Sequence, residues 1–217
     1  GPMATRRTAA RQPAPPAWVV LKFGGTSVST AARWRTILGL VRQRQAEGLR
    51  PLVVHSALAT VSNRLDELLR TAPQKEARPS ITDLRERHYA LARDLGVDGP
   101  AELDSLFDEL DQLLAGIHLI GEASPRIQAR VMAMGELMAT RLGAAFLRAE
   151  GLPVTWLDAR NLLSSRVVPG ANERTAYLSA ICEFEPDPEL RARLDAVPGV
   201  ALTQGFIASN VRGECVL

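Results

Sequence analysis

A lysine followed by two glycines and two hydroxyl side chains is the part of this sequence best suited to chemistry. Residues Lys22–Val28 read KFGGTSV and follow a short apolar run. Glycines lack a Cβ atom, so their backbone N–H groups can approach a phosphate closely, and Lys22 adds a full positive charge. The spacing fits neither a Walker loop nor the G-x-G-x-x-G pattern. It predicts a phosphate-binding turn; the alternative is a plain tight turn with a surface lysine.

A second candidate is an acidic residue in an otherwise apolar helix. Between Val131 and Leu147 the only charged side chains are Glu136 and Arg141. A carboxylate in such surroundings needs a partner or water. Small neighbours on the same face leave room for a cleft there. The alternative is an exposed glutamate on the back of the helix.

The elements that must position these residues follow from periodicity. A nearly continuous apolar run beginning at Trp18 predicts a buried strand, and a second one covers Leu52–Val54. Helical spacing predicts one helix between them, ending near Gly48, and another over about 61–69. This order is typical of a βαβ unit in an α/β fold. It places Lys22 at the carboxyl end of the first strand, where such sheets bind ligands.

The middle of the chain, about 79–150, has helical periodicity and no strand pattern. Three helices are expected, the third beginning with Ser124 as N-cap and Pro125 at the first helical position. Further predicted elements are strands at 154–157, 167–168 and 200–208, a helix at 173–184 and a short helix between the prolines at 188 and 198.

Composition excludes several classes of protein. The 217 residues are 46% hydrophobic, too many for a disordered chain. Apolar runs such as Ala144–Leu147 are far shorter than the ~20 residues of a membrane span, so no membrane partner is expected. Two cysteines and three histidines lie far apart, which argues against a zinc site or a disulfide framework and favours the cytoplasm.

The slight positive charge belongs to the N-terminal segment. The formal charge is +2, with 26 basic and 24 acidic side chains. Residues 1–17 carry three arginines and no acid, so the rest has 23 basic and 24 acidic side chains. No nucleic-acid-binding face is implied. We expect residues 1–17 to be a tag remnant (Gly1-Pro2) and a proline-containing disordered tail, with a transit peptide as the alternative.

Five motifs in order resemble those of aspartate kinases, members of the amino acid kinase family. The first is KFGGTSV. The others are Val54–Asn63 (VHSALATVSN), Met134–Thr140 (MGELMAT), Leu157–Arg160 (LDAR) and Thr203–Asn210 (TQGFIASN), so that the resemblance extends over nearly everything from Trp18 to Leu217. The resemblance implies a three-layer αβα sandwich with a mostly parallel sheet, and residues 18–217 would form the N-terminal part of a kinase domain.

The resemblance also implies roles for individual residues. The ATP phosphates would be contacted by Lys22, Phe23, Gly24 and Gly25, with Lys22 as the catalytic cation. L-Aspartate would be contacted by Ser56, Ser62, Glu136, Gly205 and Phe206, with Glu136 binding its amino group. No protein ligand to a metal is assigned. Thr60 replaces a usual glycine, so that turn is expected to be tighter or shifted, and Ala208 replaces another glycine, a mild change.

The implied reaction transfers the γ-phosphoryl group of Mg-ATP to the side-chain carboxylate of L-aspartate, the first step of lysine, threonine and methionine biosynthesis. A carboxylate is already a nucleophile, so positioning and charge stabilisation should suffice. The alternatives are a kinase for glutamate, acetylglutamate or UMP, and a non-catalytic oligomerisation segment. The surrounding sequence is also reminiscent of aspartokinases fused to diaminopimelate decarboxylase.

The family's Gly-Arg-Gly-Gly-Ser-Asp loop does not occur before Leu217. This predicts a fragment, truncated on the C-terminal side, with little kinase activity of its own. The last strand would then have an unpaired edge, which predicts self-association.

Overall fold

The computed structural model describes residues 10, 17–76, 78–162, 164–165, 188–205, 208–210 and 215–216. The helices are α1 (Ala31–Ala46), α2 (Val61–Thr71), α3 (Thr82–Leu95), α4 (Gly99–Ile120), α5 (Pro125–Ala149), α6 (Ala159–Leu162) and α8 (Pro188–Asp195), with a 3₁₀ turn at Thr26–Val28. The strands are β1 (Trp18–Phe23), β2 (Arg50–His55), β3 (Val154–Trp156), β4 (Ser164–Ser165), β5 (Val200–Gln204), β6 (Ala208–Asn210) and β7 (Cys215–Val216).

Four parallel strands form the main sheet, in the order β1-β2-β5-β3. A second sheet has the order β4-β6-β7. The prediction of one strand over 200–208 is wrong, because β5 ends at Gln204 and Ala208 begins β6 in the other sheet. The predicted strand at 167–168 and helix at 173–184 lie outside the described residues.

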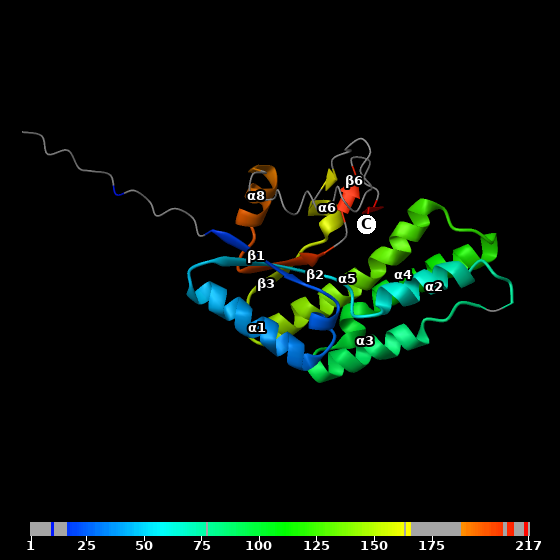
Figure 1. The fold of residues 1–217 in the computed structure, drawn as a ribbon, viewed down its shortest axis with the longest axis horizontal. Helices are drawn as coiled ribbons and strands as arrows, with labels where there is room; N and C mark the ends of the chain where they lie inside the picture. Colours follow the sequence, from blue (N-terminus) through cyan, green and yellow to red (C-terminus); the bar gives the residue numbers. More distant parts are fainter. Residues whose placement is uncertain are drawn as a thin grey trace, which may run out of the picture.

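Helices cover both faces of the main sheet, which confirms the α/β class (Figure 1). Val53, Val200 and Leu202 face a core shared with α1 and α5. On the opposite face Leu52, Val54 and Ala201 pack against residues of α8 and the turn after it. The chain crosses from β2 to β3 and then returns to β5, and right-handed crossovers in opposite directions place their helices on opposite faces.

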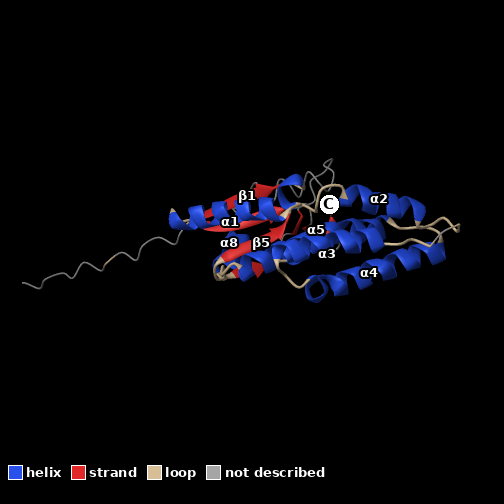
Figure 2. Ribbon diagram, turned by 90° about the horizontal axis from the view of Figure 1, so that it is seen from below, coloured by secondary structure: helices blue, strands red, loops and turns tan. Residues whose placement is uncertain are grey.

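The predicted helical section is confirmed and extends away from the sheet (Figure 2). α2, α3 and α4 each pack against α5, and α3 also packs against α4. α5 begins as expected, with the Ser124 hydroxyl accepting from the Ile127 N–H at 3.2 Å. Its 25 residues span about 37 Å, so it reaches from this bundle to the sheet. Among the described helices, none has the length and apolar character needed to cross a bilayer.

The prediction of an unpaired last strand is wrong. β5 lies inside the main sheet, hydrogen-bonded to β2 on one side and β3 on the other. Self-association was expected because of that unpaired edge. Without the edge it stays a prediction that the structure does not support.

Two histidines are buried in the core with one ring nitrogen engaged. His55 Nδ1 donates to the Ser56 carbonyl at 2.9 Å, and His88 Nδ1 donates to the Leu84 carbonyl at 2.7 Å. Within the described part of the chain, neither Nε2 atom has a hydrogen-bond partner. Burial lowers the pKa of each ring from 6.5 to about 4.

These histidines should make the fold sensitive to acid. Between pH 6.5 and 4 the unfolded chain binds protons that the folded chain excludes, so the free energy of unfolding falls as the pH falls. The loss should reach about 3 kcal/mol for each ring. Urea denaturation at pH 7 and pH 4.5 measures it. His88→Asn keeps a donor near the Nδ1 position and should reduce the loss by about half; an unchanged loss would contradict this assignment.

Candidate functional site

Three strand ends lie side by side at the carboxyl edge of the main sheet. Phe23, the last residue of β1, is in register with His55 of β2, which is in register with Gln204 of β5. The ladder continues one residue further, because the N–H groups of Ser56 and Gly205 donate to the Phe23 and His55 carbonyls at 3.2 and 2.9 Å. The structure thus brings the predicted β1 turn together with Ser56 and Gly205.

The β1 turn and the β2 turn touch through their backbones at Gly25. A Cβ atom on Gly25 would lie 3.0 Å from both the Ala57 oxygen and the Ala59 nitrogen. Ser29 fastens the same contact: its hydroxyl donates to the Gly25 carbonyl at 2.5 Å and accepts from the Ala59 N–H at 2.9 Å. A side chain at position 25 would force the two turns apart.

In contrast to Gly25, both Gly24 and Lys22 border open space. A Cβ atom on Gly24 would meet nothing within 4 Å, and the Lys22 side chain is exposed. The N–H groups of Ser27 and Val28 bond back to the Gly24 and Gly25 carbonyls. These two N–H groups are engaged within the turn and are not available to a ligand. The turn is tight, as the plainer interpretation expected, and it also has an open face beside a cation.

Glu136 is buried on α5, with 4% of its surface exposed, so the alternative of an exposed glutamate is wrong. α5 runs antiparallel to the strands: Thr140 bonds Gln204 at the end of β5, whereas Arg148 bonds the carbonyl of Val154 at the start of β3. Glu136 lies one turn before Thr140 on the same face, and therefore about 6 Å further in the direction of the carboxyl edge.

The remaining predicted residues are less closely grouped. Ser56 is half-buried and its hydroxyl donates to the Ala57 carbonyl at 3.1 Å. Ser62 is exposed in the first turn of α2, and no side chain caps that helix. Phe206 lies outside the described residues. The structure therefore groups Lys22, Gly24, Gly25, Ser56 and Gly205, and it places Glu136 on the helix that packs against this edge.

Thr60 takes the left-handed backbone conformation that favours glycine, with a φ of 70°. At this residue the replacement of glycine leaves a glycine-like backbone in place, at a strain of about 1 kcal/mol. Arg87 of α3 donates to the Thr60 hydroxyl at 2.8 Å. This bond ties the turn to the helical section.

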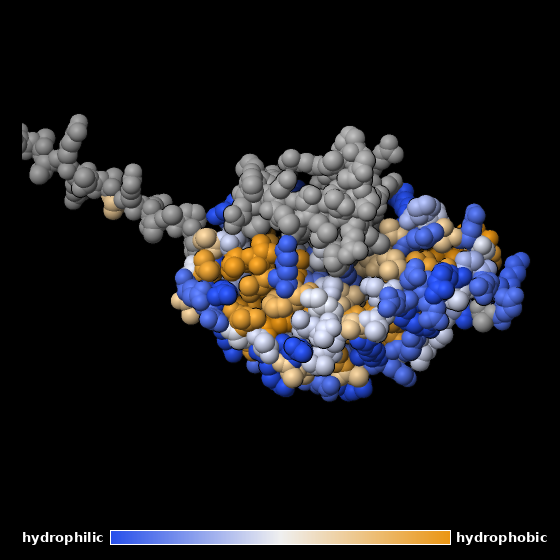
Figure 3. Space-filling view, viewed as in Figure 1, coloured by the Kyte–Doolittle hydropathy of each residue, from blue (hydrophilic) through white to orange (hydrophobic). Residues whose placement is uncertain are grey.

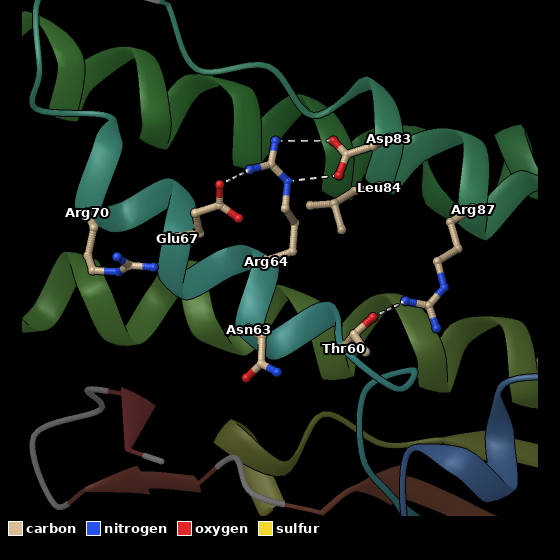
Figure 4. A pocket seen from close by; sticks show the side chains of 8 residues that line it. All are labelled: Thr60, Asn63, Arg64, Glu67, Arg70, Asp83, Leu84 and Arg87. Atoms are coloured by element: carbon tan, nitrogen blue, oxygen red, sulfur yellow. Dashed lines mark hydrogen bonds and ion pairs between the residues drawn. The ribbon is translucent and has the colours of Figure 1, made fainter.

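A separate pocket of about 530 Å³ lies between α2 and α3. Its charged side chains mostly engage one another: Arg64 points to Asp83 at 2.8 Å and to Glu67 at 3.4 Å (Figure 4). Desolvation raises the pKa of Asp83, but the Arg64 guanidinium outweighs it and keeps that pKa below its usual value. The surface over these helices is mainly hydrophilic (Figure 3). The pocket contains none of the predicted site residues.

Sequence reasoning missed one feature of the site. The buried Thr140 and Gln204 and the half-buried Trp156 are joined by hydrogen bonds, one helical turn from Glu136. The available signal was the type of residue: Thr140 and Gln204 are polar positions in segments that otherwise read as buried.

A comparison with known families gives a match over residues 17–216 to the model of the amino acid kinase family. The chain belongs to that family. Its curated relatives include an Arabidopsis thaliana chloroplastic bifunctional aspartokinase/homoserine dehydrogenase, 32% identical over 89% of this chain, and a Chlamydia trachomatis aspartokinase, 30% identical over 90%.

Among solved structures, Escherichia coli aspartokinase III in complex with aspartate and ADP matches with a TM-score of 0.55, at 25% identity and over 92% of this chain. The chain spans only part of these proteins: 21% of the Arabidopsis enzyme, 41% of the Chlamydia enzyme and 43% of the solved chain.

The two glycines of the turn should respond differently to the same substitution. Gly25→Ala places a methyl group against backbone atoms that cannot turn away, and should lower the free energy of unfolding by about 1–3 kcal/mol. Gly24→Ala meets open space and should change it by less than about 0.5 kcal/mol. Urea denaturation of both variants tests this, and equal losses would contradict the close approach at Gly25.

Proposed function

We propose that this chain supplies the phosphate-binding and amino-acid-binding edge of an aspartokinase, an enzyme that transfers the γ-phosphoryl group of ATP to the side-chain carboxylate of L-aspartate. The observation that carries the proposal is the alignment of the Lys22–Gly25 turn with the ends of β2 and β5, with a buried carboxylate on the adjoining helix. The resemblance of chain and fold to aspartokinases supports the choice of substrate.

The Lys22–Gly25 turn and Glu136 each have chemistry suited to one of the two substrates. Lys22 offers a positive charge to the oxygens of the transferring phosphoryl group, and Gly24 leaves space for the phosphates. The Glu136 carboxylate is negatively charged and offers acceptor oxygens, which suits the ammonium group of an amino acid, because charge-assisted hydrogen bonds between such groups are strong. Ser56 directly follows β2, beside the end of β1, and adds a hydroxyl at this edge.

The chemical step itself asks little of the protein. An oxygen of the substrate carboxylate forms the new bond to the γ-phosphorus, and the bond from that phosphorus to the β–γ bridging oxygen breaks. The electron pair leaves with ADP, and the product is an acyl phosphate. No proton has to be removed from the nucleophile, so Lys22 contributes by charge stabilisation and the turns by positioning.

Mg²⁺ would enter with the nucleotide. In the described part of the chain, no group of three His, Cys, Asp or Glu side chains gathers around one point. These residues form no dedicated metal site, and Mg²⁺ is commonly held largely by substrate phosphates. We therefore assign it no residue and no step.

Acyl phosphate formation tests the proposal directly. The complete gene product that contains this chain should form a hydroxylamine-trappable product from L-aspartate and Mg-ATP, and less of it from glutamate or acetylglutamate. UMP gives no acyl phosphate, so with UMP the measurement is ADP release, which should stay low. Lys22→Ala should lower kcat by ~10²-fold or more. Lys75→Ala, at the other, exposed lysine, is the matched control. Turnover of another acceptor in place of aspartate would refute the proposal.

Glu136 should act on the amino acid and not on the nucleotide. Glu136→Gln keeps the shape but removes the charge, so it should weaken aspartate binding by ~10-fold or more while leaving ADP affinity nearly unchanged. Titration calorimetry with each ligand measures both. Glu150→Gln, an exposed position just after α5, is the control. Equal weakening for both ligands would assign Glu136 to the core instead of the substrate.

A further inference from the structure

The hydroxyl of Thr140 ties α5 to the end of the main sheet. It accepts a hydrogen bond from Trp156 Nε1 and another from Gln204 Nε2, each at 2.9 Å. It also donates to the carbonyl of Glu136 at 2.7 Å. A hydroxyl group has one donor and two acceptor sites, so all three are used. We call Thr140, Trp156 and Gln204 the Thr140 network.

The network reaches four elements around the carboxyl edge. Trp156 is the last residue of β3, and Gln204 is the last residue of β5. The amide oxygen of Gln204 accepts from the N–H of Ala159 at the start of α6, at 2.8 Å. Thr140 and Gln204 are fully buried, so no water competes for the bond between them, whereas Trp156 is half-buried. A change that removes the hydroxyl leaves the buried Gln204 amide and the Trp156 indole N–H without their acceptor, which is costly.

These bonds fix α5 against the strand ends at one turn from Glu136. A further directional contact, the hydrogen bond from Arg148 to the Val154 carbonyl at 2.8 Å, lies at the start of β3, far from Glu136 along the helix. The other contacts of α5 with the sheet are mainly apolar packing, and hydrophobic contacts have no directional preference. The hydrogen bonds of the Thr140 network are directional, and they hold α5 at a point one turn from the Glu136 carboxylate. The β1 turn is held separately, by the bonds of Ser29 to Gly25 and Ala59.

We propose that the Thr140 network is a positioning device for Glu136 that sets the affinity for the amino-acid substrate, with little effect on the nucleotide. The proposal rests on the proposed function, because it takes Glu136 as the group that binds the substrate ammonium. It adds residues that hold this carboxylate in place without touching the substrate. A displacement of about 1 Å at such a group is enough to weaken its interaction strongly.

The test compares two replacements of Thr140 in the complete gene product. Thr140→Val keeps the shape and removes the hydroxyl, whereas Thr140→Ser keeps the hydroxyl. Calorimetric titration with L-aspartate and with ADP gives both affinities for each variant. The Val variant should bind aspartate at least ~10-fold more weakly and ADP within about twofold of the unmodified protein, and the Ser variant should bind aspartate almost normally.

The matched control is Thr71→Val at the end of α2. The Thr71 hydroxyl also bonds back to a carbonyl four residues earlier, Glu67 at 3.0 Å, but on an exposed surface. It should change neither affinity. If Thr140→Val does not fold, Trp156→Phe decides: it removes one of the two donors and should lower aspartate affinity by a smaller factor in the same selective way.

The outcomes separate this inference from the proposed function. If the unmodified protein fails to bind aspartate, the proposed function is refuted and the inference with it. If it binds aspartate, and the Val and Phe variants lose both affinities equally or lose neither, the network is only structural and the inference alone is overturned.

Discussion

The close approach of α5 to the sheet is the constraint on which most of this structure depends. A Cβ atom at Gly143 would lie 2.3 Å from the ring of Trp34 and 3.0 Å from Nε2 of His55. Trp34 is itself held by a hydrogen bond from its indole N–H to the Val28 carbonyl at 2.9 Å and by an edge contact with His55. Glycine at position 143 therefore lets α5 pack against Trp34 of α1 and His55 of β2 at once.

The two halves of the candidate site have different kinds of support. The proposed phosphate side is a contact of backbone with backbone at Gly25, which permits no side chain there. The proposed amino-acid side is a carboxylate on a long helix, held by side-chain hydrogen bonds from the ends of two strands. The first is rigid because its atoms cannot rotate away. The second depends on groups that substitution can remove one at a time.

Periodicity and capping residues were sufficient to predict β1, β2 and α1 to α5, because these segments have strong patterns and clear ends such as Ser124-Pro125. They failed at the last predicted strand. The sequence through Gly205 reads as continuous, but the chain leaves one sheet and enters another there, and the pairing partner is not encoded by the hydropathy of a single segment. Whether Glu136 is buried or exposed could not be predicted from the sequence either, because its burial depends on where α5 lies relative to the sheet and the helical bundle.

The order of the strands has a consequence for how the chain folds. β5 lies between β2 and β3, although Val200 follows His55 by 145 positions in the sequence. β1 and β2 are close in sequence and can pair early, whereas β3 has no place in the main sheet until β5 arrives. Such non-local pairing is slow because the ends of a long loop must first meet. During synthesis the hydrogen-bonding edge of β2 therefore stays unpaired until β5 has been made.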